Sequence, residues 1–472
     1  MGMQYHHLFQ TYPVSLLSRA YCRFLLERCP ECGGERLSTI LDSMAGVTAP
    51  LCTRCSLTRE ILKRALALPL VWEDVLEAYA LFPLYRRTIR AMVSGIAFFG
   101  PRIPQPTGSP WKVTWNVTNK CNLRCLHCYV DSAGRKSRGE LDTKDGFALV
   151  DKMADAGVAI ITLSGGEPLL RKDVYKIARR ARGSGIYVRM ETSGTLIDRK
   201  TAKKLAAWGV RAVDISLDGG VPKTHDTLRQ KPGCFMQASE GISNCAGTGS
   251  FDDVAVTMTL TGKNWKEVAI AYDQARRLRA TSFRVSALLP LGRGRGLRMP
   301  VTHPQRVEVM RFLHGQLGNA LEGRGPLPLT KWMPYYTRFV SDGGFILPDP
   351  IIYFSLRSLA KGDRRFEASA MRTAQAFTRL FGACTAGISS CGLSPEGFLL
   401  PCAPSGAKLG NLKTGSLQRA WLQDKTLSML RDRKSLKGKC RACIEREICG
   451  GSRIQAFASG YDWMETDPGC PY

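Results

Sequence analysis

The chain has 472 residues, of which 44% are hydrophobic, enough to bury the cores of about two or three domains. Its 67 Lys and Arg against 40 Asp and Glu leave a formal net charge of +27, which favours nucleic acid, anionic lipid or a polycarboxylate substrate as partners. No uncharged apolar run of about eighteen residues and no secretion-signal pattern is present, so we expect a cytoplasmic protein without a transmembrane anchor.

The 17 cysteines indicate metal or redox chemistry, because disulfides are rare in a large chain without an export signal. They form three sets, within residues 22–55, 121–128 and 384–470, and Cys234 and Cys245 lie outside these sets. This grouping predicts three metal-bearing regions.

The first set lies in residues 1–100, where we expect a small helical, zinc-ribbon-like region. Two C-x2-C pairs, separated by residues 33–51, are typical of a four-thiolate site for zinc or for a mononuclear iron. The four ligands are Cys29, Cys32, Cys52 and Cys55. We expect a structural role and no nucleic-acid binding, because no interleaved basic and aromatic motif accompanies the site. The amphipathic segment Leu62–Phe99 offers an alternative, peripheral contact with an anionic membrane.

Residues 101–110 form a proline-rich linker, and residues 111–296 alternate short β-branched runs with longer segments of helical period. This alternation is typical of repeated βα units around a parallel sheet, so the expected fold class is α/β. The six expected strands are Lys112–Val117, Ala159–Ser164, Ile186–Glu191, Arg211–Leu217, Val254–Leu260 and Ser282–Leu288. The expected helices include Thr143–Ala156, Arg171–Ser184, Asp198–Trp208 and Asn264–Leu278.

Right-handed crossovers curl such units into an open (β/α)6 barrel or a doubly wound sheet, and both forms bind ligands at the carboxyl ends of the strands. Cys121, Cys125 and Cys128 follow the first strand directly. Three thiolates on a four-iron cluster leave one iron without a protein ligand, so a small molecule can bind there. The loop therefore predicts a reactive iron-sulfur cluster.

Two further turns follow strands of the same sheet. Ser164–Pro168 contains glycines that let the backbone approach a ligand, and Glu167, which can accept a hydrogen bond from an ammonium group. Ser216 and Asp218 follow the fourth strand, where ribose hydroxyls would be met. Each turn alone is also what an ordinary strand end offers.

In this order, the C-x3-C-x2-C loop, the Gly-Gly-Glu-Pro turn and the serine-bearing fourth strand resemble the radical S-adenosylmethionine (SAM) superfamily over residues 110–295. The resemblance implies a partial (β/α)6 barrel over residues 111–296 whose three cysteines hold a [4Fe-4S] cluster. It implies reductive cleavage of SAM to a 5′-deoxyadenosyl radical that abstracts hydrogen from a substrate. The SAM contacts that it implies are Gly165, Gly166 and Glu167 at the methionine amine, Ser216 and Arg229 at the ribose or carboxylate, and Tyr129 beside the adenine.

Two less informative segments come next. Gly292–Gly296 is expected to be a solvated basic loop, and residues 297–380 a connecting and capping helical region. Neither segment carries a motif with a defined chemistry.

Residues 381–472 hold the third set of cysteines, in two groups. Four thiolates are enough to fill every iron of a [4Fe-4S] cube, and three leave one iron open. The first group is Cys440, Cys443, Cys449 and Cys470, and the second is Cys384, Cys391 and Cys402. The arrangement resembles the SPASM extension of radical SAM enzymes, which carries one or two auxiliary iron-sulfur clusters, although a zinc ribbon is an alternative.

Ser452 and Arg453 stand where many SPASM proteins place a further cysteine. We therefore expect the three-cysteine group to keep an open iron. There are two alternatives: a non-cysteine ligand binds that iron, or only the four-cysteine cluster assembles.

The Gly450–Arg453 ending and the Ser394–Gly397 turn look most like the branch that modifies tetrapyrroles in alternative haem and haem d1 synthesis, and peptide-maturing enzymes share much of this pattern. We therefore expect hydrogen abstraction from an anionic substrate, a tetrapyrrole carboxylate side chain or a peptide, with ferredoxin or flavodoxin as electron donor. No catalytic residue is assigned beyond the cofactor contacts. The alternatives are a radical SAM enzyme that modifies membrane lipid, and a non-catalytic protein that binds zinc and nucleic acid.

Overall fold

The computed structural model of the chain describes residues 12–47, 51–66, 79–80, 83–132, 134, 137–341, 345, 347–360, 364–460 and 462–472. Its core is a ten-stranded sheet in the order β10-β9-β8-β1-β2-β3-β4-β5-β6-β7. The strands are β1 Lys112–Thr118, β2 Ile160–Gly165, β3 Tyr187–Thr192, β4 Val210–Ser216, β5 Asp253–Leu260, β6 Ser282–Ala287, β7 Leu327–Lys331, β8 Ser390–Leu393, β9 Phe398–Leu400 and β10 Gly410–Asn411.

The helices fall into an N-terminal group, a barrel group and a C-terminal group. The N-terminal helices are α2 Tyr12–Leu26, α3 Arg36–Met44, α4 Thr53–Leu66 and α6 Pro83–Phe99. The next group is α7 Thr143–Asp155, α8 Val174–Gly183, α9 Arg199–Ala207, α10 Pro222–Arg229, α11 Cys234–Thr248, α12 Val268–Arg277, α13 His303–Leu321, α14 Tyr335–Ser341, α15 Pro350–Ala360 and α16 Arg364–Phe381. The last group is α17 Leu417–Gln423, α18 Lys425–Arg431, α19 Gly438–Ala442, α20 Arg446–Cys449 and α21 Arg453–Gly460.

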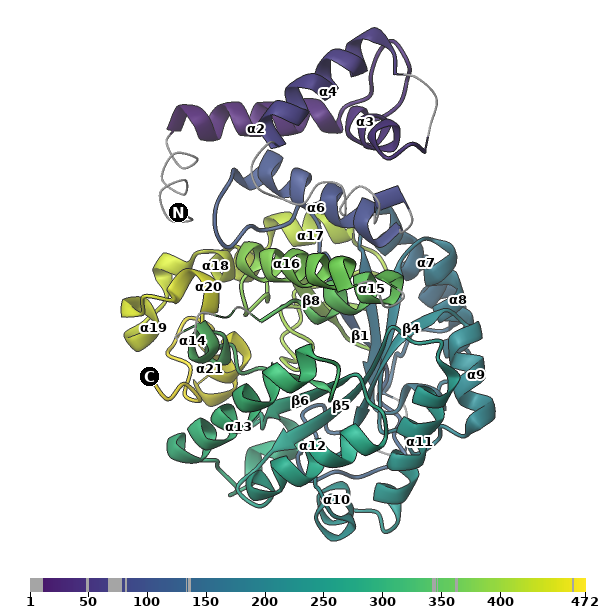
Figure 1. Cartoon of the computed structure of the whole chain (residues 1–472), viewed down its shortest axis with the longest axis vertical. Helices are drawn as coiled ribbons and strands as arrows, with labels where there is room; N and C mark the ends of the chain where they lie inside the picture. The colour runs from purple at the N-terminus through teal and green to yellow at the C-terminus, as the bar shows by residue number, and fades with distance from the viewer. Residues whose placement is uncertain are drawn as a thin grey trace.

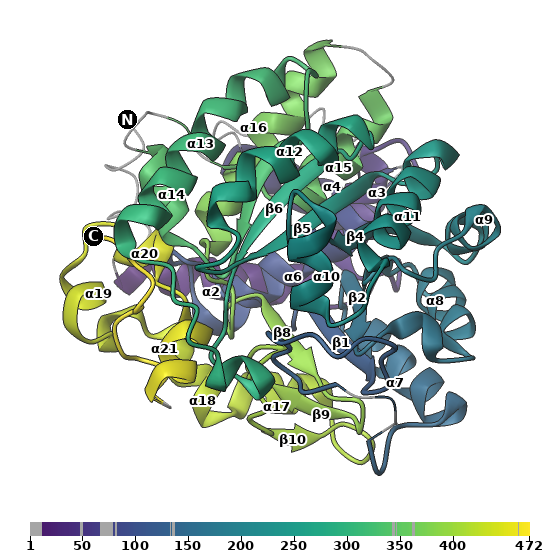
Figure 2. The ribbon, with the colours of Figure 1, turned by 90° about the horizontal axis from the view of Figure 1, so that it is seen from below.

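Strands β1 to β6 lie side by side in chain order, each parallel to the next. A doubly wound sheet reverses its order at a switch point, whereas this order never reverses, so every right-handed crossover puts its helix on the same face. Figures 1 and 2 show the helices α7 to α12 wrapped around the outside of these strands. The partial (β/α)6 barrel expected from the sequence is confirmed.

Side chains alternate across the barrel strands, as β1 shows. Val113, Trp115 and Val117 are fully buried, and Trp115 packs against α7. The intervening Lys112 and Thr114 line a cavity inside the barrel. Burial of each large apolar side chain contributes about 1.5–3 kcal/mol, so the apolar outer face holds the helices while the inner face stays polar.

The six expected strands agree with the observed ones within one residue at each end. Two of the expected helices are shorter: α8 begins at Val174, three residues later than expected, and the 3-10 turn Trp265–Glu267 takes up the start of the helix expected at Asn264–Leu278. The sequence-based prediction missed α10 and α11, which lie between β4 and β5.

Two strands from outside residues 111–296 extend the barrel sheet. β7 comes from the region expected to be helical and pairs in parallel with β6, placing Lys331 opposite Ser286. β8 pairs in parallel with β1, placing Cys391 opposite Val113. The C-terminal cysteine region is therefore joined directly to the edge of the barrel.

Helices α2, α3 and α4 lie at one end of the molecule, and α6 lies between them and the barrel (Figure 1). The amphipathic segment Leu62–Phe99 falls partly outside the described residues, at 67–78 and 81–82. Among the helices that the structure describes, none is long and apolar enough to cross a membrane.

Candidate active site

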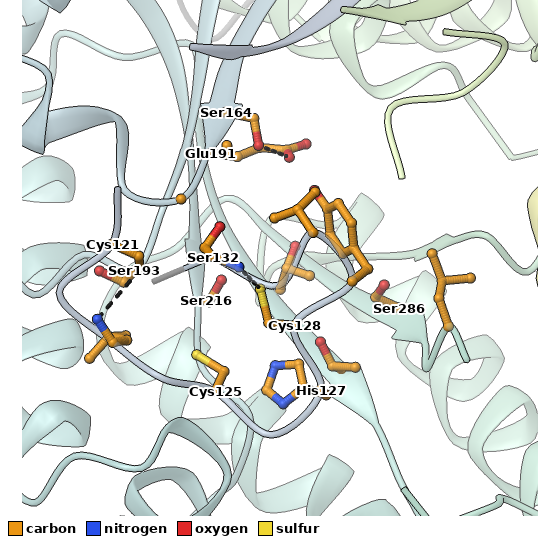
Figure 3. A pocket seen from close by; sticks show the side chains of 18 of the residues that line it. Cys121, Cys125, His127, Cys128, Ser132, Ser164, Glu191, Ser193, Ser216 and Ser286 are labelled. Atoms are coloured by element: carbon orange, nitrogen blue, oxygen red, sulfur yellow. Dashed lines mark hydrogen bonds between the residues drawn. The ribbon is translucent and has the colours of Figure 1, made fainter. Parts of the chain in front are cut away.

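The three cysteines of the loop after β1 line one cavity at the carboxyl ends of the barrel strands. Figure 3 shows Cys121, Cys125 and Cys128 around this cavity, and Leu123 packs among the thiols. Burial, together with the charge of neighbouring groups, raises the pKa of Cys121 to about 12, and burial likewise raises the pKa of Cys125. Three adjacent thiolates need a cationic centre to neutralise them, so the set fits an iron-sulfur cluster.

Arg293 holds this cysteine loop in place. Its guanidinium donates to the carbonyl oxygens of Cys125 at 2.8 Å and Ser132 at 2.7 Å, and pairs with Asp131 at 2.7 Å. The expectation that Gly292–Gly296 is a solvated loop is therefore wrong for Arg293, which the short 3-10 helix turns toward the cavity. The Gly-Arg repeat gave no signal of this long-range contact.

Asp218 is fully buried beneath the cysteine loop. Its Oδ2 lies 2.6 Å from Nε of Arg229 and 3.1 Å from Nε2 of His127, and its Oδ1 accepts from the backbone N–H of Thr259 at 2.7 Å. Arg229 Nη1 in turn lies 3.6 Å from the Cys125 sulfur. The expectation that Asp218 meets a ribose hydroxyl is wrong, because its carboxylate is fully buried and does not line the cavity.

Electrostatics keep Asp218 and Arg229 charged. Burial opposes ionisation of Asp218, but Arg229 and His127 outweigh it and hold the pKa of Asp218 far below its usual value. Burial would lower the pKa of Arg229, yet Asp218 and Cys125 raise it. The pair therefore fixes a positive guanidinium against one thiol of the loop. Sequence reasoning missed His127 and this role of Asp218.

The glycines after β2 let the backbone approach the cysteine loop. Gly165 has a φ of 130°, and a Cβ there would lie 2.4 Å from the Thr118 carbonyl oxygen. A Cβ on Gly166 would lie 2.3 Å from the Lys120 carbonyl oxygen. Both glycines also line the cavity, so the turn leaves room for a ligand there and no larger residue fits either position.

Glu167 is fully buried and bonded to the end of β3. Its Oε1 accepts from the Thr192 hydroxyl at 2.7 Å, and its Oε2 accepts from the backbone N–H of Ser193 at 2.8 Å and from the Ser193 hydroxyl at 2.7 Å. The carboxylate thus fastens the second strand end to the third. Its expected contact with an amine stays a prediction.

Ser216 and Tyr129 line the cavity with the three cysteines, as expected. The Tyr129 ring packs edge-on against Trp332, with 5.5 Å between ring centres. Tyr129 and Trp332 also line a second cavity inside the barrel, and Glu191 and Lys331, paired at 2.7 Å, do the same. The two cavities therefore share one wall.

The second cavity brings together the first group of C-terminal cysteines. Cys384, Cys391 and Cys402 all line it, and Ser452, where the resemblance to SPASM proteins implies a cysteine, lines it as well. Burial, with the charge of Cys384, raises the pKa of Cys402 to about 12. As at the first loop, such a set fits a metal cluster that neutralises the thiolates.

The remaining four C-terminal cysteines form a neighbouring group, joined to the first where the backbone N–H of Cys384 donates to the Cys449 carbonyl oxygen at 3.3 Å. Cys440, Cys443, Cys449 and Cys470 line one further cavity. Arginine side chains approach two of these sulfurs: Arg453 lies 3.5 Å from Cys440 and Arg338 lies 3.6 Å from Cys443. Four converging thiols with cationic donors fit a closed cluster.

The N-terminal cysteines form a compact group whose four sulfurs all lie within 4.8 Å of one another. The Cys29 and Cys52 sulfurs are 3.7 Å apart, and those of Cys32 and Cys55 are 3.8 Å apart. Tetrahedral zinc with Zn–S bonds of about 2.3 Å needs sulfurs about 3.8 Å apart. A hydrogen bond from the backbone N–H of Cys32 lowers the pKa of Cys29 to about 6, whereas burial and the neighbouring thiols raise the pKa of Cys55, so Cys29 ionises first.

We expect Cys55→Ala to lose about one zinc or mononuclear iron per chain, because removing one of four thiolates opens a tetrahedral site. Metal analysis of anaerobically purified protein measures this loss. Cys22→Ala is the matched control, since Cys22 lies on α2 outside the four-sulfur group and its replacement should leave the metal content unchanged. Equal metal content in Cys55→Ala and the wild type would contradict the assignment.

The sequence matches the radical SAM superfamily over residues 115–275 and the SPASM iron-sulfur cluster-binding domain over residues 384–444. The AdoMet-dependent heme synthase of Methanosarcina barkeri is 31% identical over 366 residues, which cover 78% of this chain and 97% of that protein. The chain belongs to the radical SAM superfamily. As a radical SAM enzyme with a SPASM domain, it uses a [4Fe-4S] cluster and SAM together with auxiliary iron-sulfur clusters.

Other relatives of this radical SAM enzyme fall into two groups. The pre-heme d1 synthase of Dinoroseobacter shibae is 30% identical and covers 78% of this chain and 88% of its own length. The mycofactocin maturase MftC of Mycobacterium tuberculosis is 28% identical and covers 77% of this chain and 83% of its own length. Membership of an enzyme family sets aside the alternative of a non-catalytic zinc and nucleic-acid binding protein.

Among solved structures, Streptococcus suis SuiB bound to its precursor peptide SuiA has a TM-score of 0.62 at 14% identity, covering 96% of this radical SAM chain and 92% of SuiB. The structure of anSMEcpe with bound AdoMet has a TM-score of 0.55 at 17% identity, covering 76% of this chain and 94% of anSMEcpe. At these identities, the likeness shows the fold.

Proposed function

We propose that this radical SAM enzyme abstracts hydrogen from a carboxylate-bearing side chain of a tetrapyrrole. The observation that carries the proposal is the shared wall between two cavities. One is lined by Cys121, Cys125 and Cys128, and the other by Cys384, Cys391 and Cys402. A substrate in the second cavity would lie between the SAM site and an auxiliary cluster, and the names of the heme and pre-heme d1 synthases among the relatives support a tetrapyrrole.

In this proposal the cysteine loop after β1 holds the catalytic [4Fe-4S] cluster. When bound, the cluster and SAM supply the 5′-deoxyadenosyl radical that removes a hydrogen atom from the substrate. Arg293 and the Asp218–Arg229 pair keep the loop in position beneath the cavity. Because the positive guanidinium of Arg229 lies against Cys125, it also favours the thiolate form of that residue.

The SAM contacts that the resemblance implies are part of this proposal, and the lining of the cavity supports several of them. Ser216 and Tyr129 line it, so we assign Ser216 to the ribose or carboxylate and Tyr129 to the adenine. The methionine amine lies at Gly165 and Gly166, whose backbone borders the cavity. Glu167 contacts the amine only if its carboxylate gives up one of the bonds to the β3 end. Arg229 faces the cavity while paired with Asp218, and we assign its guanidinium to the ribose or carboxylate of SAM.

Each of the two C-terminal cysteine groups would hold one auxiliary cluster. Cys440, Cys443, Cys449 and Cys470 would close one [4Fe-4S] cluster, and Cys384, Cys391 and Cys402 would hold another that keeps one iron open. Ser452 borders the three-cysteine group, so its hydroxyl is the nearby non-cysteine candidate if that cluster is closed. These clusters would exchange an electron with the substrate or with a ferredoxin or flavodoxin donor.

A peptide substrate is the second candidate, supported by the mycofactocin maturase among the relatives and by the fold likeness to SuiB, a protein solved with a precursor peptide. No feature of the described residues favours a membrane lipid. The polar side chains that line the second cavity favour a charged substrate over a neutral one.

The test is SAM cleavage by anaerobically reconstituted, chemically reduced enzyme. We expect iron coproporphyrin, which carries four carboxylates, to stimulate 5′-deoxyadenosine formation and to undergo a change in mass. Its tetramethyl ester, the matched control, should do neither. If an acidic peptide stimulates 5′-deoxyadenosine formation and the porphyrin does not, the substrate is a peptide. If neither probe stimulates it, both candidate substrates are wrong.

A further inference from the structure

The second cavity contains ion pairs that are already complete. Arg284 lies 3.0 Å from Asp214 and also pairs with Asp253. Lys331 lies 2.7 Å from Glu191. The lining carboxylates Asp214 and Glu191 therefore each have a cation partner inside the barrel.

Asp349 is the other carboxylate on the cavity wall. Its Oδ1 accepts from the backbone N–H groups of Ile351 at 3.0 Å and Ile352 at 3.1 Å, at the start of α15. It caps that helix and makes no ion pair within 4.0 Å among the described residues. Burial lowers the pKa of Lys112 and the charge of Asp349 opposes this lowering, so Asp349 balances part of the positive charge of the cavity from beyond ion-pair distance.

Lys112 and Arg189 line the same cavity and have no such partner. Among the residues that the structure describes, neither side chain makes an ion pair or a hydrogen bond. Arg189 is only 8% exposed, and its Nε is buried without an acceptor. A cation in such a site is costly unless an anion joins it, so two of them together indicate a ligand with negative charge.

The register of the sheet brings the two cations to the same part of the barrel interior. Arg189 on β3 is opposite Thr162 on β2, which is opposite Thr114 on β1. Lys112 faces inward two residues before Thr114, and all four side chains line the cavity. Two strand spacings separate β1 from β3 by roughly 10 Å, which the two long side chains can bridge around one anionic group.

We propose that Lys112 and Arg189 form a carboxylate-binding subsite in the barrel interior that anchors a tetrapyrrole side chain. This inference rests on the proposed function and names residues that select its substrate. Tyr129 and Trp332, in the wall shared with the SAM cavity, lie farther toward the carboxyl ends of the strands. A side chain anchored at the subsite would leave the rest of the substrate directed toward that wall.

A competing role for Lys112 is to neutralise the auxiliary thiolates. Burial raises the pKa of Cys402, and the charges of Lys331 and Lys112 act in the opposite direction. If this were the main role of Lys112, its loss would weaken the cluster at Cys384, Cys391 and Cys402. Iron content therefore separates the two roles.

The experiment measures equilibrium binding of iron coproporphyrin and of its tetramethyl ester by their absorbance changes, using the full-length, anaerobically reconstituted enzyme. The variants are Lys112→Met, Arg189→Met and the double variant, which keep an unbranched stem and remove the charge. Lys176→Met on α8 is the matched control, because Lys176 is exposed and outside the barrel interior. Lys112→Arg tests whether charge alone restores binding.

We expect each single variant to lose about tenfold in affinity for the acid and the double variant about a hundredfold, because each removes one charged hydrogen bond. All variants should keep the wild-type affinity for the ester and the wild-type iron and sulfide content. Lys176→Met should also keep the wild-type affinity for the acid. Lys112→Arg should recover most of the affinity for the acid that Lys112→Met loses. A double variant that still prefers the acid over the ester overturns the subsite alone. A fall in the iron content of Lys112→Met would assign Lys112 to the cluster at Cys384, Cys391 and Cys402, and would also overturn the subsite.

The wild type separates failure of the subsite from failure of the proposed function. If the wild type binds acid and ester equally while it still cleaves SAM, the proposed tetrapyrrole carboxylate substrate is wrong and the subsite falls with it. If the wild type prefers the acid, the proposed substrate class stands whatever the variants show.

Discussion

Cys125→Ala should lower 5′-deoxyadenosine formation by at least about 100-fold, since even indirect ligand supports at metal sites are worth 10–100-fold. The substitution leaves Cys121 and Cys128 as the two thiolates of the loop after β1. It also deprives the Arg229 guanidinium of its sulfur partner. The rate is measured on anaerobically reconstituted, reduced protein by the amount of 5′-deoxyadenosine formed.

Cys245→Ala is the matched control for this substitution. Cys245 is fully buried on α11 and belongs to none of the cysteine groups that line a cavity. It should keep the wild-type rate, while Cys125→Ala should also lose about four irons per chain. Unchanged 5′-deoxyadenosine formation in Cys125→Ala would place the reactive cluster elsewhere.

Asp218→Asn should lower the free energy of unfolding by about 3–5 kcal/mol, the usual cost of leaving one partner of a buried ion pair uncompensated. Asp218 is fully buried, and its replacement leaves the buried Arg229 guanidinium without a negatively charged partner. The shift is measured from urea unfolding curves of the anaerobic protein.

Asp151→Asn provides the comparison at the surface. Asp151 pairs with Arg180 at 2.7 Å, but both side chains are largely in solvent, so its replacement should cost at most about 1 kcal/mol. If the two substitutions lower the unfolding midpoint equally, the buried pair beneath the cysteine loop does not have the structural role assigned to it.

Sequence patterns were sufficient for the barrel strands because their information is local. Val113, Trp115 and Val117 alternate with polar residues, and the same apolar face recurs on each strand, so the strand ends were predicted within one residue. The cysteine loop and the Gly165–Gly166 turn were likewise found from local spacing. Parallel βα topology then brings both to the same cavity.

Contacts between distant segments were not predictable in this way. Arg293 reaches the carbonyl oxygen of Cys125 across 168 positions of the chain, and the Gly-Arg repeat around it looks like a solvated loop. Lys331 lies on β7, in a region that was expected to be helical. The short β7 pattern carries little strand signal of its own, and its pairing with β6 supplies the missing stabilisation.

Asp218 shows a different reason for failure. A polar residue after a strand usually marks a ligand contact or an ordinary turn, and the sequence favours neither. Burial of this carboxylate depends on α10, which supplies Arg229, and on the cysteine loop, which supplies His127. Because the prediction missed α10, Arg229 was expected only as a SAM contact, and its pairing with Asp218 was not predicted.

Cys121, Cys125 and Cys128 should leave one cluster iron free to bind SAM. Electron paramagnetic resonance of the reduced protein detects SAM at that iron. Addition of SAM should change the cluster signal of the wild type and of Cys402→Ala, and should change nothing in Cys125→Ala. If SAM leaves the wild-type signal unchanged, or if it still changes the signal of Cys125→Ala, SAM does not bind a cluster held by these three cysteines.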